Sequence, residues 1–308
     1  MRENNQRQNP FVLAPVLMLP ILVFLGIASV IIGKPLEKNI SYIIATFLFL
    51  FVFIMPIVFY FRLRGGKWLS SCFASISFRS VVFSVSAALL MMAHSVAYRS
   101  FTLGDFFDYR IYTIYGVPFS LDVESFGAFI GVFFVGGVVP ALLEGVFFRG
   151  IFMHEYRFGG VVLSIFMSSA LYAMMGMDFI SFPLYFLNGI MLSAVVFLTK
   201  NLFCSVLTHL IYILFVMLGE KYLLFLAIET ETRGVMLFLL FGAWLTIAIF
   251  FFDAAEKILR KYGENEQPKP IGLSKRNCFR VCYDILFVPM LWIDIFCFSI
   301  ISILHLFF

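Results

Sequence analysis

The chain has 308 residues, of which 62% are hydrophobic and only 13% are charged. Soluble globular domains carry roughly 25% charged residues, so this composition argues against a water-soluble domain. We predict an all-α fold, a polytopic helix bundle in contact with membrane lipid. The net charge of +4 fits attraction to anionic lipid at a membrane surface, and no nucleic-acid partner is expected.

Nine apolar runs are long enough to cross a bilayer, which takes roughly 17–25 residues per helix. In chain order they are 11–33, 40–61, 80–97, 125–148, 158–176, 181–199, 201–219, 235–252 and 285–308. Tight junctions between some runs leave eight or ten helices as alternatives. We predict a single membrane domain over 1–308, with a cytoplasmic linker over 254–283 before the last helix.

Basic residues predict the orientation, because cytoplasmic loops carry an excess of Lys and Arg. With the N-terminus in the cytoplasm, the outer segments hold only six of the 22 basic residues: Lys34, Lys38, Arg99, Arg110, Lys221 and Arg233. The sequence thus predicts a multi-pass membrane protein whose N-terminus is cytoplasmic. The outer segment 98–124 is acidic and aromatic, and it has room for a short interfacial helix.

Two charged residues, Glu144 and Arg149, lie at the end of the fourth, otherwise apolar run. A charge near the bilayer centre costs on the order of 2.5–3.5 kcal/mol, so such residues usually face a protein-lined cavity. On an α-helix the two side chains would lie about 140° apart and would not form an i,i+4 pair. We therefore expect the surroundings of Glu144 to come from other helices. The structural alternative is that Arg149 reaches the membrane interface while Glu144 is a packed polar residue.

A histidine, His209, lies in the seventh run, on one helix face with Ser205 and Ile213 and beside Tyr212. A lone histidine on an apolar helix is usually a hydrogen-bonded core residue; beside a buried glutamate, a functional pair is an equal alternative. No metal and no cofactor are expected. The dipeptide His154-Glu155 begins like the H-E-x-x-H zinc motif but lacks its second histidine.

The block 125–217 resembles the CAAX protease and bacteriocin-processing (CPBP) family, intramembrane glutamic proteases that include CAAX prenyl protease type II. The family's three motifs are E-E-x-x-x-R, F-x-x-x-H and H-x-x-x-N. In this chain they fall on Glu144 to Arg149, Tyr172 to Gly176 and His209 to Ile213. The resemblance implies that Glu144, Arg149 and His209 form the catalytic site. Glu144 would activate water, His209 would stabilise the oxyanion and Arg149 would have a structural role.

Three motif positions differ from the family: Gly145, Gly176 and Ile213. The family has a second Glu, the second-motif His and the third-motif Asn there. Losing one oxyanion donor typically slows a reaction by about 10²–10³, and losing an acid–base partner by about 10²–10⁴. We therefore expect activity to be reduced or lost. Candidate substitutes for the missing groups are His94, Tyr172, the Tyr212 hydroxyl and Asp178.

Three functions follow from these residues. The first is an endopeptidase that hydrolyses membrane-associated peptides or proteins with Glu144-activated water and no covalent intermediate. The second is a non-catalytic pseudoprotease that binds a membrane peptide or partner, in an immunity or regulatory role. The third is a small transporter that uses Glu144 as a proton or substrate site, although the sequence has no inverted repeat to favour it. The oligomeric state does not follow from the sequence.

Overall fold

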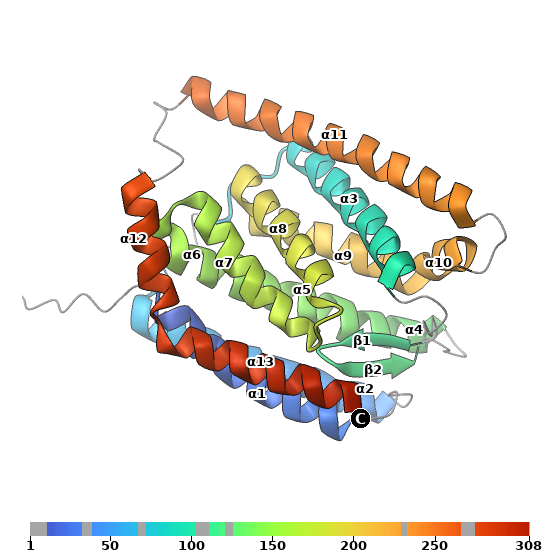
Figure 1. Cartoon of the computed structure of the whole chain (residues 1–308), viewed down its shortest axis with the longest axis horizontal. Helices are drawn as coiled ribbons and strands as arrows, with labels where there is room; N and C mark the ends of the chain where they lie inside the picture. Colours follow the sequence, from blue (N-terminus) through green and yellow to red (C-terminus); the bar gives the residue numbers. More distant parts are fainter. Residues whose placement is uncertain are drawn as a thin grey trace, which may run out of the picture.

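The computed structural model describes residues 11–32, 39–66, 72–102, 111–120, 126–228, 233–265 and 275–307. These residues are mostly helical (Figure 1). The α-helices are α1 (Leu13–Ile31), α2 (Asn39–Arg64), α3 (Phe78–Thr102), α4 (Phe126–Phe133), α5 (Val139–Glu144), α6 (Met153–Tyr156), α7 (Val161–Ala173), α8 (Phe182–Thr199), α9 (Leu202–Leu218), α10 (Glu220–Ile228), α11 (Arg233–Asn265), α12 (Lys275–Leu286) and α13 (Pro289–Phe307). Two antiparallel strands, β1 (Ile111–Ile114) and β2 (Val117–Ser120), form a hairpin.

Six helical stretches among these residues are long and apolar enough to cross a membrane. A seventh arises if Arg280–Leu286 and Pro289–His305, which meet at 56°, form one bent span. The described residues of the nine expected runs are largely helical, but Val161–Gly176 and Leu202–Leu218 are shorter than the other spans. The structure thus supports a multi-pass membrane protein with six or seven spans, and the count of nine is not confirmed.

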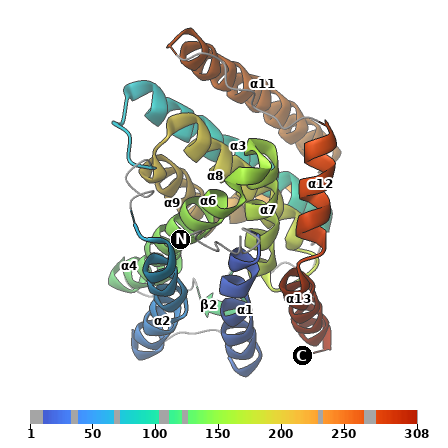
Figure 2. The same cartoon turned by 90° about the vertical axis from the view of Figure 1, so that its left-hand side faces the viewer.

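The helices pack in layers around a central group (Figures 1 and 2). On one face α11 lies along α3, and α3 packs on α8 and α9. On the opposite face α1 pairs with α13 and lies beside α2. Along α11 large apolar side chains point outward: Phe238 is 75% exposed and Phe252 66%. Apolar faces of this kind are stable in contact with lipid.

The junction between α8 and α9 is fixed by local backbone chemistry. Lys200 adopts a left-handed conformation with φ of 52°, which ends α8. Asn201 is extended, and its side chain accepts a hydrogen bond from the Phe203 amide, as an N-cap residue does. The side chain of Asn201 also donates to the Ala74 carbonyl, which ties the junction to the segment before α3. This start places His209 two turns into α9.

The described part of the outer segment 98–124 differs from the expectation of an interfacial helix. Helix α3 continues to Thr102, and residues 111–120 form the β-hairpin. The turn residues Tyr115 and Gly116 have φ of 52° and 76°, the two positive values that a type I′ hairpin turn requires. Gly116 is also sterically required, because a Cβ atom there would lie 2.5 Å from the Ser29 Cβ. The acidic residues of this segment lie outside the described residues: Asp105, Asp108, Asp122 and Glu124.

Candidate active site

Glu144 and Arg149 lie on a continuous helix, from α4 to α6, that contains two π-helical segments, Phe134–Val138 and Gly145–Phe152. Between them lies Pro140, which has no N–H to donate to the preceding turn. A π-helix bonds residue i to i+5, so residues five apart lie on similar faces. The expectation of a 140° separation was wrong for this reason. Arg149 Nη1 lies 3.8 Å from Glu144 Oε2 and 3.5 Å from the Glu144 carbonyl oxygen.

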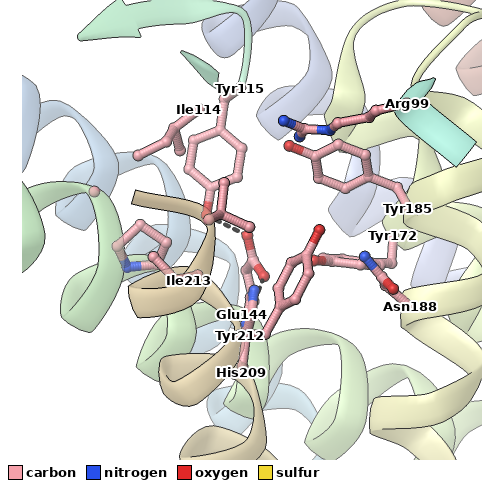
Figure 3. A pocket seen from close by; sticks show the side chains of 13 residues that line it. Arg99, Ile114, Tyr115, Glu144, Tyr172, Tyr185, Asn188, His209, Tyr212 and Ile213 are labelled. Carbon is pink, nitrogen blue, oxygen red and sulfur yellow. Dashed lines mark hydrogen bonds and ion pairs between the residues drawn. The ribbon is translucent and has the colours of Figure 1, made fainter. Parts of the chain in front are cut away.

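The Glu144 carboxyl is buried, with 3% of the residue exposed, and groups from three parts of the chain surround it (Figure 3). Its Oε1 accepts a hydrogen bond of 2.7 Å from the Tyr115 hydroxyl. Its Oε2 lies 3.5 Å from His209 Nδ1 and has no hydrogen-bond partner among the described residues. The structure therefore brings the three motif residues Glu144, Arg149 and His209 together, with Tyr115 as a fourth member.

Tyr115 comes from the tip of the hairpin and reaches down between the helices. It is 2% exposed, and its ring packs edge-on against Phe49, with 5.0 Å between ring centroids, and near Phe53 at 5.7 Å. Burial, together with the Glu144 carboxyl, raises the pKa of Tyr115 well above its ordinary value. The hydroxyl therefore keeps its proton and acts as a donor. Tyr115 was not predicted from the sequence, where its only signal is a tyrosine–glycine pair between two short β-prone runs.

A small cavity of about 30 Å³ lies beside the carboxyl. This exceeds the roughly 10–15 Å³ that one water molecule needs, but it is far too small for a peptide. Polar side chains dominate its lining: Arg99, Tyr115, Glu144, Tyr172, Tyr185, Asn188, His209 and Tyr212. The site can therefore hold water against Glu144, whereas a larger ligand requires its walls to move.

The expected helper residues fall into two groups. Tyr172 and Tyr212 line the cavity. The Arg149 guanidinium lies 4.1 Å from the Tyr172 ring centroid, and the Tyr212 hydroxyl donates to Ser95 at 3.1 Å. His94 lies near the Tyr98 ring and does not line the cavity. Asp178 instead accepts a hydrogen bond from the Ser181 amide before α8, so these last two are not brought to the site.

A buried polar network supports the wall formed by Tyr212 and Arg99. Ser95 donates to Glu220 Oε1, and Arg99 Nη1 donates to Glu220 Oε2 at 2.9 Å. Glu220 is only 1% exposed, whereas the Arg99 side chain is 21% exposed; the ion pair holds Arg99 at the cavity. The sequence analysis had placed Arg99 in an outer loop, and it gave no role to Tyr185 or Asn188.

Packing accounts for the departures at the two motif glycines. A Cβ atom at Gly145 would lie 2.9 Å from the Val206 Cγ2 of α9, so a second glutamate there would require Val206 to shift. A Cβ atom at Gly176 would lie 3.1 Å from the Tyr185 ring. Ile213 lines the cavity and is 2% exposed, so an apolar group occupies the third departing position. In the described ranges no three His, Cys, Asp or Glu side chains are grouped to hold a metal ion.

Comparison with known proteins agrees with this geometry. Residues 126–215 match the family model described as type II CAAX prenyl endopeptidase Rce1-like. No curated protein and no solved structure matches the chain significantly. The matched residues run from α4 to α9 and contain Glu144, Arg149 and His209. The match covers under a third of the chain, and within this block the chain is similar to the type II CAAX prenyl endopeptidase family.

Proposed function

We propose that the protein is an intramembrane endopeptidase in which Glu144 activates water to hydrolyse membrane-associated peptides. The observation that carries the proposal is the buried carboxyl beside a water-sized cavity, with one oxygen held by Tyr115 and the other near His209. A buried carboxyl of this kind is costly unless paired, and intramembrane ionisable residues usually mark functional sites. The match of residues 126–215 to an endopeptidase family model supports the same reading.

The reaction follows general-base chemistry. Glu144 takes a proton from water, and the water oxygen attacks the carbonyl carbon of the scissile peptide bond. The tetrahedral intermediate carries an oxyanion, for which His209 is the donor that the family resemblance assigns. Collapse breaks the C–N bond, and Glu144 returns its proton to the leaving amine. Preorganised donors act strongly in a site with little water.

Side chains at other positions take the place of the family's polar groups that are missing at Gly176 and Ile213. Asn188, from α8, brings an amide to the cavity where Ile213 of α9 has none. Its Oδ1 has no hydrogen-bond partner among the described residues, and its side chain also contacts the Tyr212 hydroxyl. Tyr172 and Tyr185 supply hydroxyl donors on the same side (Figure 3). We assign Asn188 and these tyrosines to substrate binding and oxyanion stabilisation.

Access to the site requires the hairpin to move. Tyr115 occupies the position that a peptide must take to approach Glu144, because the remaining cavity holds only water. We propose that a membrane-bound peptide displaces the hairpin tip and takes over its hydrogen bond to the carboxyl. Closing of a loop over a site excludes water and completes the site in many enzymes.

The topology assigned to this enzyme is the one that the basic residues favour. The N-terminus is cytoplasmic, the nine helical runs cross a bacterial-type plasma membrane, and the two shorter helices α7 and α9 lie at the centre of the bundle. In this orientation the hairpin lies at the outer surface.

A second function, a non-catalytic pseudoprotease that binds a membrane peptide or partner, is favoured by one specific observation. Gly145 stands where the family has its second glutamate, and a Cβ atom there would lie 2.9 Å from Val206 Cγ2. In this alternative the polar cavity is a binding site and Glu144 is a packing partner of Tyr115.

Comparison of new peptide termini in membranes tests the proposal. Cells would express the wild-type protein, Glu144→Gln or the control Glu256→Gln at matched levels. Glu256 is an exposed acidic residue that pairs with Arg260 on α11, far from the site. Termini that vanish only with Glu144→Gln support the peptidase and identify its substrates. Identical termini in all three strains would overturn it in favour of the pseudoprotease.

A further inference from the structure

A second, larger cavity of about 300 Å³ lies at the end of the bundle where α6 meets the start of α7 and the end of α8. Three basic or potentially basic side chains line it, Arg149, His154 and Arg157. Its apolar wall is formed mainly by Val161, Val196 and Phe197. The first cavity is lined by Glu144 and the second by Arg149, so the ion pair separates the two.

No acidic side chain is among the described residues that line this second cavity. The nearest carboxylate in sequence, Glu155, is fully engaged elsewhere. Its Oε1 accepts from the Tyr60 hydroxyl at 2.7 Å and its Oε2 pairs with Arg64 at 3.2 Å. Arg149 is paired with Glu144 outside this cavity, so the net positive charge of the described lining comes from Arg157 at its rim. A positive charge at the mouth of a cavity without acidic lining attracts anions.

Arg149 provides the second observation. Its side chain is 1% exposed, and a guanidinium has five N–H donors. Nη1 is directed to Glu144, but Nε and Nη2 have no hydrogen-bond partner among the described residues. Buried donors without an acceptor are strongly destabilising, most of all on a charged group. A ligand with several acceptor oxygens next to Arg149 removes this penalty.

We propose that this cavity binds a phosphate group, supplied by the headgroup of an anionic phospholipid. Phosphate oxygens form paired hydrogen bonds with a guanidinium, and basic pockets between membrane helices bind anionic headgroups. The exposed Arg157 reaches the rim of the cavity and contacts His154 at 3.3 Å. Beside it, Phe158 is 59% exposed and Val162 74%. These apolar side chains provide a surface along which an acyl chain can lie.

Native mass spectrometry of the full-length protein in neutral detergent tests this site. The protein would be titrated with phosphatidylglycerol, with zwitterionic phosphatidylcholine and with inorganic phosphate. We expect a phosphatidylglycerol adduct that forms at lower concentration than the phosphatidylcholine adduct. Arg157→Gln should weaken it by about fivefold, the effect of one basic residue at a membrane surface. Arg157 is exposed, so this variant should fold.

The control is Arg260→Gln, which removes an exposed arginine on α11 and should leave binding unchanged. If phosphatidylglycerol does not bind preferentially but inorganic phosphate does, and Arg157→Gln weakens that binding, the site takes phosphate from solution and its assignment to lipid is wrong. If neither ligand binds preferentially, or if Arg157→Gln binds as well as the wild type, the proposal is overturned. None of these measurements depends on peptidase activity.

Discussion

The hydrogen bond between Tyr115 and Glu144 gives the sharpest test of the site's geometry. Tyr115→Phe removes one hydroxyl and keeps the ring, its contacts with Phe49 and Phe53, and the turn conformation. The lost bond is 2.7 Å long and buried. It also leaves Oε1 of Glu144 unpaired beside Oε2, which already has no partner among the described residues.

A buried hydrogen bond to a charged group contributes about 1.5–3 kcal/mol. We therefore expect Tyr115→Phe to lower the free energy of unfolding by about 2 kcal/mol, measured by SDS titration of the purified protein in mixed micelles. The matched control is Tyr222→Phe, at a tyrosine that is 64% exposed, and it should change stability by less than about 0.5 kcal/mol.

A double-mutant cycle assigns the effect to this pair. In a Glu144→Gln background, Tyr115→Phe should lower the free energy of unfolding by a smaller amount, because it then removes a hydrogen bond to a neutral amide. The two losses should differ by about 1 kcal/mol. Equal effects in both backgrounds would refute the contact. The contact would also be refuted if the Tyr115→Phe protein were as stable as the wild type, because Glu144 would then not hold the hairpin tip.

Three further predictions concern the departing motif positions and the supporting network. Gly145→Glu should abolish stable expression, measured by detergent-solubilised yield, because its Cβ meets Val206; Val206→Ala in the same chain should restore part of the yield. Ile213→Asn should raise the rate of peptide cleavage by about 10²-fold by adding an oxyanion donor, measured in proteoliposomes. Glu220→Gln should lower the free energy of unfolding by about 1.5–3 kcal/mol in the SDS titration, because it removes the charged acceptor of the hydrogen bond from the partly exposed Arg99.

Each of these predictions has a contradicting outcome. Normal yield of Gly145→Glu would mean that α9 can move away and that packing does not explain the glycine. A rate for Ile213→Asn equal to that of a same-site Ile213→Leu control would show that this position does not face the oxyanion. Wild-type stability of Glu220→Gln would mean that Arg99 is held by other groups.

The helices could be predicted from the sequence because apolar run length is a local property. The run around α2, for example, appears at nearly the expected bounds of 40–61. Helix α11 begins near its expected start but continues past residue 252 to Asn265, into the expected linker. The number of spans could not be predicted in the same way. Helices α7 and α9 are shorter than the other spans, and α12 meets α13 at an angle. Whether such helices cross the membrane depends on their packing against neighbours and not on composition alone.

The candidate site could be predicted only in part. The sequence shows Glu144 in an apolar run and His209 in a later one, in the order and spacing of the family motifs. The structure brings Glu144 Oε2 and His209 Nδ1 within 3.5 Å of each other. The pairing of Glu144 with Arg149 was missed because it depends on π-helical geometry. Tyr115 was missed because its contact joins a hairpin to a helix 29 residues away, and no local pattern encodes that approach.

Peptide hydrolysis by the reconstituted protein tests the central claim most directly. Proteoliposomes containing the wild type, Glu144→Gln or Glu256→Gln would receive a membrane peptide that spans a terminus found in the cellular comparison, and mass spectrometry would follow the two products. The account predicts cleavage by the wild type and by Glu256→Gln, and a rate at least about 10²-fold lower with Glu144→Gln. Equal cleavage by folded Glu144→Gln would contradict the assignment of Glu144 as the base that activates water.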